Sequence, residues 1–255
     1  MKRYVALGSS MAAGPGIRPR AAGAPRWSGR SARNYPHLLA ERLELDLVDV
    51  TFSGATTAHV LADRQHGQPP QIAALDGSES LVTVTIGGND VGYVPLLMAA
   101  SLPRWARHVP VLGGRISELL DRDTRDRALA EASHALRAVG RAVRERAPRA
   151  RICFVDYLTI LPPAGAPAPP LSQPEADLGR HVAEALERLT ADAAVVSGCE
   201  IVSAAGASRQ HHAWSAEPWT TTPARLGVPL PGRPAPLHPN GAGMRAVAEL
   251  VAAQL

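Results

Sequence analysis

The sequence YVALGSSMAAGPG, residues 4–16, joins a short apolar run to a turn rich in glycine and serine. An unbroken apolar run of this length is typical of a strand that is buried on both faces of a parallel sheet. Gly8 allows a sharp turn at the end of that strand. Ser10 is therefore expected at the carboxyl edge of the sheet, where open α/β folds bind ligands. A helix that begins near Ser10 would offer free N–H groups to an oxyanion.

Apolar runs and helical patterns alternate along the whole chain. The expected strands are Arg3–Leu7, Leu47–Thr51, Leu81–Ile86, Arg151–Asp156 and Glu200–Ser203. The expected helices are Pro36–Leu45, Thr57–Arg64, a short one after Asp90, Arg115–Arg146 with a candidate break near 121–126, Pro174–Ser197, and Asn240–Ala253 with Asn240 as its N-cap. Such alternation predicts a parallel sheet with right-handed crossovers. We therefore predict a single α/β domain over residues 1–255, a three-layer α/β/α sandwich with a five-stranded parallel sheet, similar to the flavodoxin architecture.

Three long segments interrupt this alternation, and each follows a predicted strand. They are Ala12–Arg33, Pro162–Pro170 and Ala204–Leu237. Their shared position at the carboxyl ends of strands predicts that they form the walls of a substrate cleft, and their prolines predict stiff loops. For Pro162–Pro170, a disordered surface insertion is the alternative interpretation.

Three further segments carry residue types that suit catalysis, and they follow the first one in a fixed order. VTFSGATT (50–57) and VTVTIGGND (82–90) each place glycine and polar residues after an apolar run, and LHPN (237–240) opens the last predicted helix. Together with GSSM (8–11), these segments resemble the four blocks of the SGNH (GDSL-type) hydrolases, in particular the actinobacterial, lipase-like members of that family. The resemblance extends from residue 4 to about residue 250.

This resemblance implies a serine ester hydrolase that works through an acyl-serine intermediate. Ser10 takes the place of the nucleophile, which needs a base to accept its proton, and His238 takes the place of that base. The N–H groups of Ser10 and Gly54 and the side-chain amide of Asn89 take the places of the oxyanion-hole donors. We expect Asp90 to be a structural helper.

Two positions depart from the pattern of the family. The aspartate of the first block is replaced by Ser9, and the aspartate three residues before the histidine is replaced by Ala235. The histidine still needs a group that holds its Nδ1 proton. We predict a Ser10–His238 dyad in which the main-chain carbonyl of Ala235 orients the imidazole. Recruitment of Glu217 from the preceding loop is the alternative.

The composition argues against several other classes of function. Hydrophobic residues make up 45% of the chain, and the net charge is +4. Almost all of the positive charge comes from arginines that are spread along the chain, which favours solvated helix faces over a nucleic-acid site. No apolar run reaches about 18 residues, so no membrane span is expected. The adjacent His211 and His212 are poorly placed to share one metal, no other metal-ligand spacing occurs, and we expect neither a metal nor another cofactor.

The N-terminus and the cysteines point to a compartment. Residues 1–3 lead directly into the first predicted strand, without the apolar segment of a signal peptide. Cys153 and Cys199 lie at or near strand starts, which suits buried thiols better than a disulfide. We therefore expect a cytoplasmic protein that acts on a small-molecule ester. The sequence leaves the oligomeric state open.

Other functions are compatible with the same residues. Acyl transfer to an acceptor other than water, or hydrolysis of a thioester in a biosynthetic pathway, would use the same nucleophile and base. A relative that has lost its acid and kept only a ligand-binding pocket is a third possibility. Turnover of a simple p-nitrophenyl ester separates the enzymes from the binding protein. The sequence does not specify the acyl chain length or the alcohol portion.

Overall fold

The computed structural model describes residues 2–223 and 233–255. Five strands form one sheet in the order β2-β1-β3-β4-β5, and every neighbouring pair is parallel. The strands are β1 (Arg3–Gly8), β2 (Asp46–Asp49), β3 (Leu81–Thr85), β4 (Arg151–Val155) and β5 (Glu200–Val202). The predicted α/β fold with a five-stranded parallel sheet is thus confirmed.

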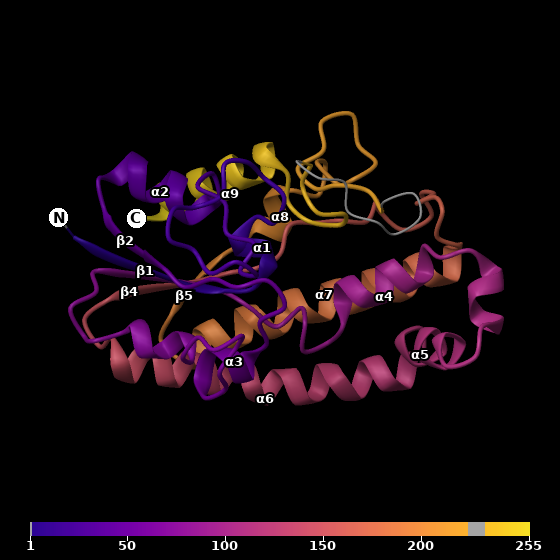
Figure 1. The fold of residues 1–255 in the computed structure, drawn as a ribbon, viewed down its shortest axis with the longest axis horizontal. Helices are drawn as coiled ribbons and strands as arrows, with labels where there is room; N and C mark the ends of the chain where they lie inside the picture. Colours follow the sequence, from indigo (N-terminus) through magenta and orange to yellow (C-terminus); the bar gives the residue numbers. More distant parts are fainter. Residues whose placement is uncertain (1, 224–232) are drawn as a thin grey trace.

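Helices cover both faces of the sheet (Figure 1). One face carries α1 (Ser10–Ala13), α2 (Tyr35–Leu43), α8 (Ala204–Ala207) and α9 (Gly241–Gln254). The other face carries α3 (Thr57–Leu61), α4 (Tyr93–Ala100), α6 (Arg122–Arg146) and α7 (Gln173–Val196). The elements η1 (Gln71–Ala74), η2 (Arg104–His108) and α5 (Leu112–Leu119) complete the described helices.

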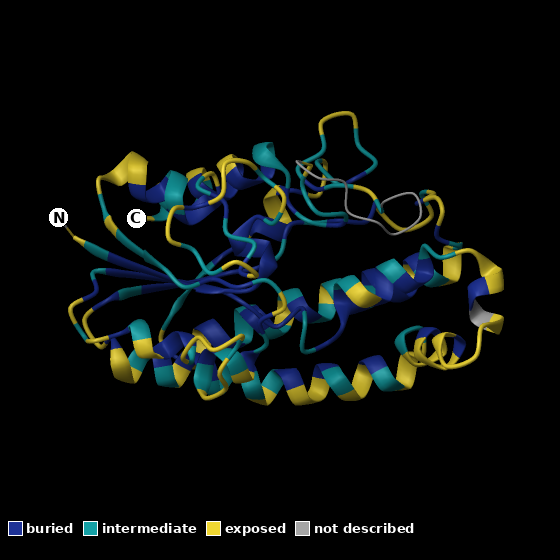
Figure 2. Cartoon of the chain, in the orientation of Figure 1, coloured by how far each residue is buried: buried dark blue, intermediate teal, exposed yellow. Residues whose placement is uncertain are grey.

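The core consists of two layers, because successive side chains of a strand point to opposite faces of the sheet. Tyr4 and Ala6 of β1 pack in the cluster that contains α2 and α9. Val5 and Leu7 pack in the larger cluster that contains α6 and α7. The inner strands β1, β3 and β4 are almost wholly buried between these layers, whereas the edge strands β2 and β5 are only partly buried (Figure 2). This explains why β1 and β3 have apolar or small residues on both faces.

Most predicted elements occur close to their expected bounds, and the long helical segment is broken as expected. Asp121 lies between α5 and α6 and caps α6, since its side chain accepts a hydrogen bond from the N–H of Thr124. Helix α3 ends at Leu61 rather than Arg64, and a tight turn between Gln65 and Gln68 follows. The sequence interpretation missed η1 and η2, which are single-turn elements without a helical repeat.

Candidate active site

The turn from β1 into α1 presents Ser10 at the carboxyl edge of the sheet. The N–H of Ser9 donates to the carbonyl oxygen of Thr85 on β3 at 2.9 Å, and α1 begins at Ser10. Gly8 is required here because a Cβ at this position would lie 2.6 Å from the same Thr85 oxygen. The Ser10 residue is 8% exposed. The strand end thus holds the serine backbone against the neighbouring strand.

A buried side chain that the sequence analysis missed fixes the same turn. The amide of Gln71, at the start of η1, accepts from the N–H of Gly8 at 2.7 Å and donates to the carbonyl of Gly8 at 3.0 Å. This pairing satisfies both main-chain groups of the glycine at the end of β1. No local motif around Gln71 indicates this role, because its partner is 63 residues away in the chain.

His238 lies directly against Ser10. Its Nε2 is 2.8 Å from Ser10 Oγ, and its Nδ1 is 2.7 Å from the carbonyl oxygen of Pro236. With the proton on Nδ1, the ring donates to the carbonyl and leaves Nε2 free to accept the proton of the serine hydroxyl. Burial lowers the pKa of His238, and the hydrogen bond to Pro236 opposes part of that effect. Burial is the larger of the two effects, and the lowered pKa suits an imidazole that is neutral at rest.

The orienting carbonyl belongs to Pro236, whereas we predicted that of Ala235. Leu237 has a φ of +61°, and this turn lets the preceding Pro236 carbonyl meet the ring of His238. The Ala235 carbonyl instead accepts the hydroxyl of Thr221 at 2.7 Å. The alternative, Glu217, is exposed, and His238 Nδ1 has the Pro236 oxygen as its partner. The histidine is therefore oriented by a main-chain group, but one residue further along than expected.

Thr221, a second residue missed by the sequence analysis, holds the histidine segment in place. Its main-chain N–H donates to the carbonyl of His238 at 3.0 Å, and its carbonyl accepts from Leu237 at 3.2 Å. The neighbouring Thr220 pairs with Pro239 in an antiparallel bridge. After this bridge Asn240 caps α9, because its side chain accepts from the N–H groups of the first turn. The segment before α9 is therefore anchored along its length.

The three predicted oxyanion donors differ in whether they already make a hydrogen bond. The N–H groups of Ser10 and Gly54 have no acceptor among the described residues, and Gly54 has a φ of +79°. One N–H of the Asn89 amide donates to the carbonyl of Ala55 at 2.8 Å. Because a side-chain amide has two N–H bonds, the second remains for a ligand. These groups belong to the residues predicted to form an oxyanion hole.

Asp90 joins two of these segments, as the prediction of a structural helper implies. Its carboxylate accepts from the Thr57 N–H at 3.0 Å and from the Thr57 hydroxyl at 2.5 Å. Thr57 begins α3, three residues after Gly54. Burial raises the pKa of Asp90, and the hydrogen bonds from Thr57 counteract part of that rise. The link holds the Gly54 loop next to Asn89.

Tyr157, at the end of β4, connects the nucleophile turn with the third block. Its hydroxyl lies 3.0 Å from Ser9 Oγ and accepts the N–H of Gly88 at 3.0 Å. A Cβ on Gly88 would lie 2.2 Å from the tyrosine ring, so glycine is needed for this approach. Burial raises the pKa of Tyr157 to about 12, and the phenol is therefore neutral. The residue lies outside all four blocks, and sequence reasoning missed it.

The comparisons with known proteins agree with this geometry. The sequence profile of the GDSL-like lipase/acylhydrolase family matches residues 6–246. The chain belongs to this family. It is also 34% identical to Lipase 2 of Streptomyces coelicolor over 256 residues, which covers 96% of this chain and 83% of that lipase. The chain is thus a lipase-like hydrolase of the GDSL family.

Solved structures share the fold of this GDSL-family chain. The phospholipase A1 of Streptomyces albidoflavus NA297 superposes with a TM-score of 0.82 at 24% identity, covering 100% of this chain and 99% of that one. The extracellular lipase of Streptomyces rimosus gives a TM-score of 0.81 at 22% identity and covers 100% of both chains. At these identities the likeness concerns the fold.

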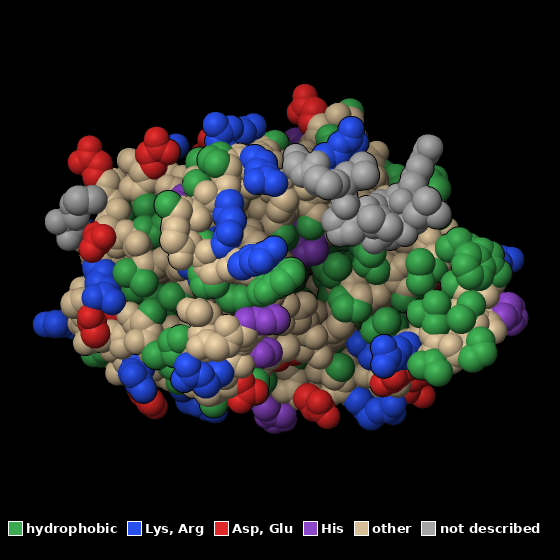
Figure 3. Space-filling model, viewed as in Figure 1, with side chains coloured by type: hydrophobic (Ala, Val, Ile, Leu, Met, Phe, Trp, Pro, Cys, Tyr) green, Lys and Arg blue, Asp and Glu red, His purple; other side chains and the backbone are tan. Residues whose placement is uncertain are grey.

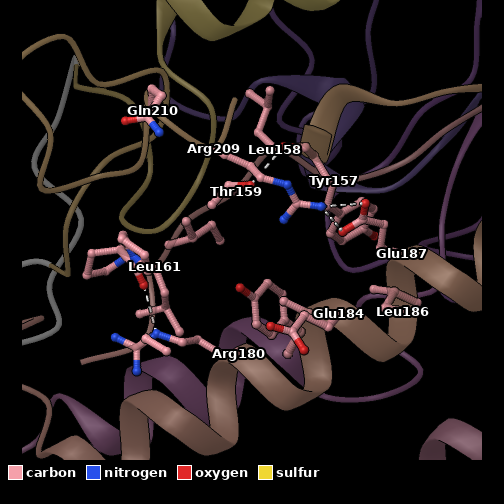
Figure 4. A pocket seen from close by; sticks show the side chains of 17 residues that line it. Tyr157, Leu158, Thr159, Leu161, Arg180, Glu184, Leu186, Glu187, Arg209 and Gln210 are labelled. Carbon is pink, nitrogen blue, oxygen red and sulfur yellow. Dashed lines mark hydrogen bonds and ion pairs between the residues drawn. The ribbon is translucent and has the colours of Figure 1, made fainter. Parts of the chain in front are cut away.

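A cavity of about 310 Å³ is lined by Tyr157, whose hydroxyl contacts Ser9 Oγ (Figure 4). Its wall comes from the chain that follows β4 and from α7, and includes Ile160, Leu161 and Leu186. The charged groups at this cavity are largely paired. Arg209 forms an ion pair with Glu187 at 3.0 Å, and Arg180 donates to the Pro162 carbonyl at 2.7 Å. The cavity therefore suits an apolar group rather than an ion.

The described residues offer neither a metal site nor a membrane-spanning helix. Within residues 2–223 and 233–255, no three His, Cys, Asp or Glu side chains converge in a way that could hold a metal ion. Over the same residues, the helices are too short or too polar to cross a bilayer. Cys153 and Cys199 are free thiols.

Proposed function

We propose that this member of the GDSL family is a carboxylic-ester hydrolase in which Ser10 and His238 act as a dyad without a carboxylate. The observation that carries the proposal is the position of the imidazole, with Nε2 at 2.8 Å from Ser10 Oγ and Nδ1 at 2.7 Å from the Pro236 carbonyl. A serine hydroxyl becomes an effective nucleophile when such a base accepts its proton. A protein that only binds a ligand has no need of this alignment.

The first half of the proposed reaction acylates the serine. His238 Nε2 takes the hydroxyl proton while Ser10 Oγ attacks the ester carbonyl carbon, and the carbonyl oxygen becomes an oxyanion. The N–H groups of Ser10 and Gly54 and the free N–H of Asn89 stabilise that charge. The tetrahedral species then collapses, the bond to the alcohol oxygen breaks, and the leaving alcohol takes the proton from His238. The product of this half is acyl-Ser10.

The second half repeats these steps with water in place of the serine hydroxyl. His238 accepts a proton from water, the resulting hydroxide oxygen attacks the acyl carbon, and Ser10 leaves with the proton from the imidazole. The orienting Pro236 carbonyl accepts a hydrogen bond but carries no net charge, so it stabilises the transient imidazolium less than a carboxylate does. We therefore expect slower turnover than in relatives that keep a full triad.

The cavity beside Tyr157 offers this reaction an apolar compartment. It lies next to the side chain that contacts both Ser9 and Gly88, and its volume of about 310 Å³ is at the lower end for ligand pockets, which span about 300–1,000 Å³. A cavity of this size and lining favours esters with a short or medium apolar chain over bulky ones.

Hydrolysis of p-nitrophenyl butyrate with simultaneous labelling tests the proposal. We expect turnover of the ester, and a fluorophosphonate should block it while adding its mass to the tryptic peptide that contains Ser10. Adding alcohols or amines during turnover distinguishes hydrolysis from acyl transfer, because a transferase would form the new ester or amide in preference to the free acid. Labelling of a different serine would contradict the proposal.

A further inference from the structure

The loop between α1 and α2 is cationic throughout. It contains the arginines Arg18, Arg20, Arg26, Arg30 and Arg33, and the first acidic residue of the chain is Glu41, in α2. Solvated arginines on the helices are interspersed with acids, as in the pair of Arg137 with Asp192. The loop has no acid of its own to neutralise it. Its charge therefore needs a separate explanation.

Hydrogen bonds attach this loop to segments on both sides of the active site. The carbonyl of Ser28 accepts from the N–H of Ser53, the residue before Gly54, at 2.8 Å. The carbonyl of Pro15 accepts from the N–H of Ala235, three residues before His238, at 2.9 Å. The loop also continues directly from α1, which begins with Ser10. It therefore borders the oxyanion-hole side and the histidine side together.

Close packing of glycines shows that this position is fixed. A Cβ on Gly16 would lie 2.0 Å from the carbonyl of Arg233, and one on Gly29 would lie 2.3 Å from the hydroxyl of Ser53. Arg18 follows Gly16 by two residues, and Arg26 precedes Gly29 by three. The backbone two residues before Arg18 therefore lies against the histidine segment, and the backbone three residues after Arg26 lies against the Gly54 segment.

Arg30 differs from the exposed arginines of the loop. Arg30 is partly buried and structural, since its side chain donates to the Thr51 carbonyl at 2.7 Å and lies 4.0 Å from the Asp49 carboxylate. Arg18 and Arg26 are exposed and have no acidic partner among the described residues, and the guanidinium of Arg26 lies over the ring of Trp27. In Figure 3, Lys and Arg side chains line the middle of the face where this loop runs, whereas the acidic side chains lie toward the edges.

We propose that Arg18 and Arg26 bind an anionic group on the substrate, so that the preferred esters carry a carboxylate or phosphate in the part that does not react. This inference rests on the proposed esterase function and specifies its substrate class. Unpaired cations beside a reactive site raise the local concentration of anions. A guanidinium also pairs with carboxylate and phosphate oxygens through two parallel hydrogen bonds. The cavity beside Tyr157, whose charges are largely paired, cannot supply this recognition.

A matched pair of substrates tests the proposal, namely 4-acetoxybenzoate and its uncharged methyl ester. The variant Arg18→Gln/Arg26→Gln should lower kcat/KM for the anion about tenfold and leave the methyl ester within about twofold, and 0.5 M salt should remove most of this difference. The control Arg141→Gln/Arg146→Gln removes the same charge from exposed positions on α6 and should change neither substrate. Equal losses in the two double variants, or equal losses for the two esters, would overturn the inference.

Two further measurements distinguish a failure of the arginine proposal from a failure of the proposed esterase function. If the wild-type protein hydrolyses neither ester, the esterase function fails. Binding of 4-acetoxybenzoate to the Ser10→Ala variant, with and without the two arginine substitutions, then still tests the loop, and unchanged binding refutes it. The second measurement is sedimentation of the protein with phosphatidylglycerol vesicles, which are anionic, and with phosphatidylcholine vesicles, which carry no net charge. If the loop variant alters only the binding of anionic vesicles, the loop recognises a lipid surface and not the substrate's own charge, which also refutes the proposal.

Discussion

The serine and the histidine of this site are held by different kinds of structure. Ser10 follows a central strand, and its turn is fixed by the β3 backbone, by Gln71 and by Tyr157 through Ser9. His238 lies in a connection without a strand, and it is held by an isolated bridge, one threonine and one main-chain carbonyl. The nucleophile side is therefore part of the sheet, whereas the base side is a short anchored loop.

This difference explains how the proposed dyad works without a carboxylate. A carboxylate in a triad both orients the imidazole and stabilises its charged form. In the proposed dyad, the turn at Leu237 and the Thr220–Pro239 bridge supply orientation through the backbone, and only charge stabilisation is lost. The proposed dyad thus separates the two roles of the acid, and the following experiments test that separation.

The largest effect should follow removal of the reacting groups. Ser10→Ala and His238→Ala should each lower kcat/KM for p-nitrophenyl butyrate by about 10⁴-fold or more, because neither partner acts without the other. Ser9→Ala is the matched control, since it removes a neighbouring hydroxyl whose one hydrogen-bond partner among residues 2–223 and 233–255 is Tyr157, and it should cost less than about tenfold. Circular dichroism and melting curves check that all three variants fold. A loss in Ser9→Ala that equals the loss in Ser10→Ala would contradict the assignment.

The second-largest effect should follow removal of the Asn89 amide, which stabilises the negative charge on the substrate oxygen. Asn89→Ala should reduce kcat by about 10²–10³-fold with a smaller change in KM, because the amide matters most as the oxyanion forms. Steady-state kinetics on the same ester measure both parameters. If kcat stays at the wild-type value, Asn89 is a turn residue that bonds Ala55 and nothing more.

The Thr221 hydroxyl tests whether the loop alone orients the base. Thr221→Val keeps the shape of the side chain but leaves the Ala235 carbonyl without its donor, so we expect kcat to fall about tenfold and the free energy of unfolding to fall by about 1–3 kcal/mol. Thr220→Val is the control, because the Thr220 hydroxyl donates to Thr159, away from His238. A variant that loses stability but keeps its full kcat would show that Thr221 does not position the imidazole.

The pH dependence of kcat/KM tests whether His238 has a carbonyl or a carboxylate as its partner. Burial lowers the pKa of His238, and the base works only when it is neutral, so kcat/KM should rise with pH and level off with an apparent pKa below the ordinary histidine value of about 6.5. A carboxylate partner would instead favour the imidazolium and move the profile toward higher pH. An apparent pKa above about 7 for kcat/KM would therefore indicate an acid at the site.

The sequence predicted the parts of the site that are local and missed those set by contacts across the fold. Ser10, Gly54 and Asn89 each follow a strand, and the parallel arrangement of those strands was sufficient to bring the three together. The roles of Gln71, Tyr157 and Thr221 depend on partners far away in the chain, and no pattern near them indicates those partners. The shift from Ala235 to Pro236 has a conformational cause, because the positive φ of Leu237 is not visible in its residue type.

The smallest effect is expected from chelators and reductants. The chemistry assigned to Ser10 and His238 needs no metal, and Cys153 and Cys199 are free thiols. EDTA should therefore leave the esterase rate unchanged, and dithiothreitol should leave the melting temperature unchanged. A loss of rate in EDTA would point to a metal that takes part in the reaction, and a drop in melting temperature would point to a disulfide.

The partner of His238 Nδ1 in an acylated or phosphonylated enzyme tests the central claim most directly. In a crystal structure of the phosphonate adduct, we predict a covalent bond to Ser10 Oγ and one phosphonyl oxygen near the N–H groups of Ser10 and Gly54 and the Asn89 amide. We also predict that Nδ1 remains on the Pro236 carbonyl, as in the free protein. A carboxylate oxygen within about 3.2 Å of Nδ1 would contradict the account, because the base would then belong to a triad after all.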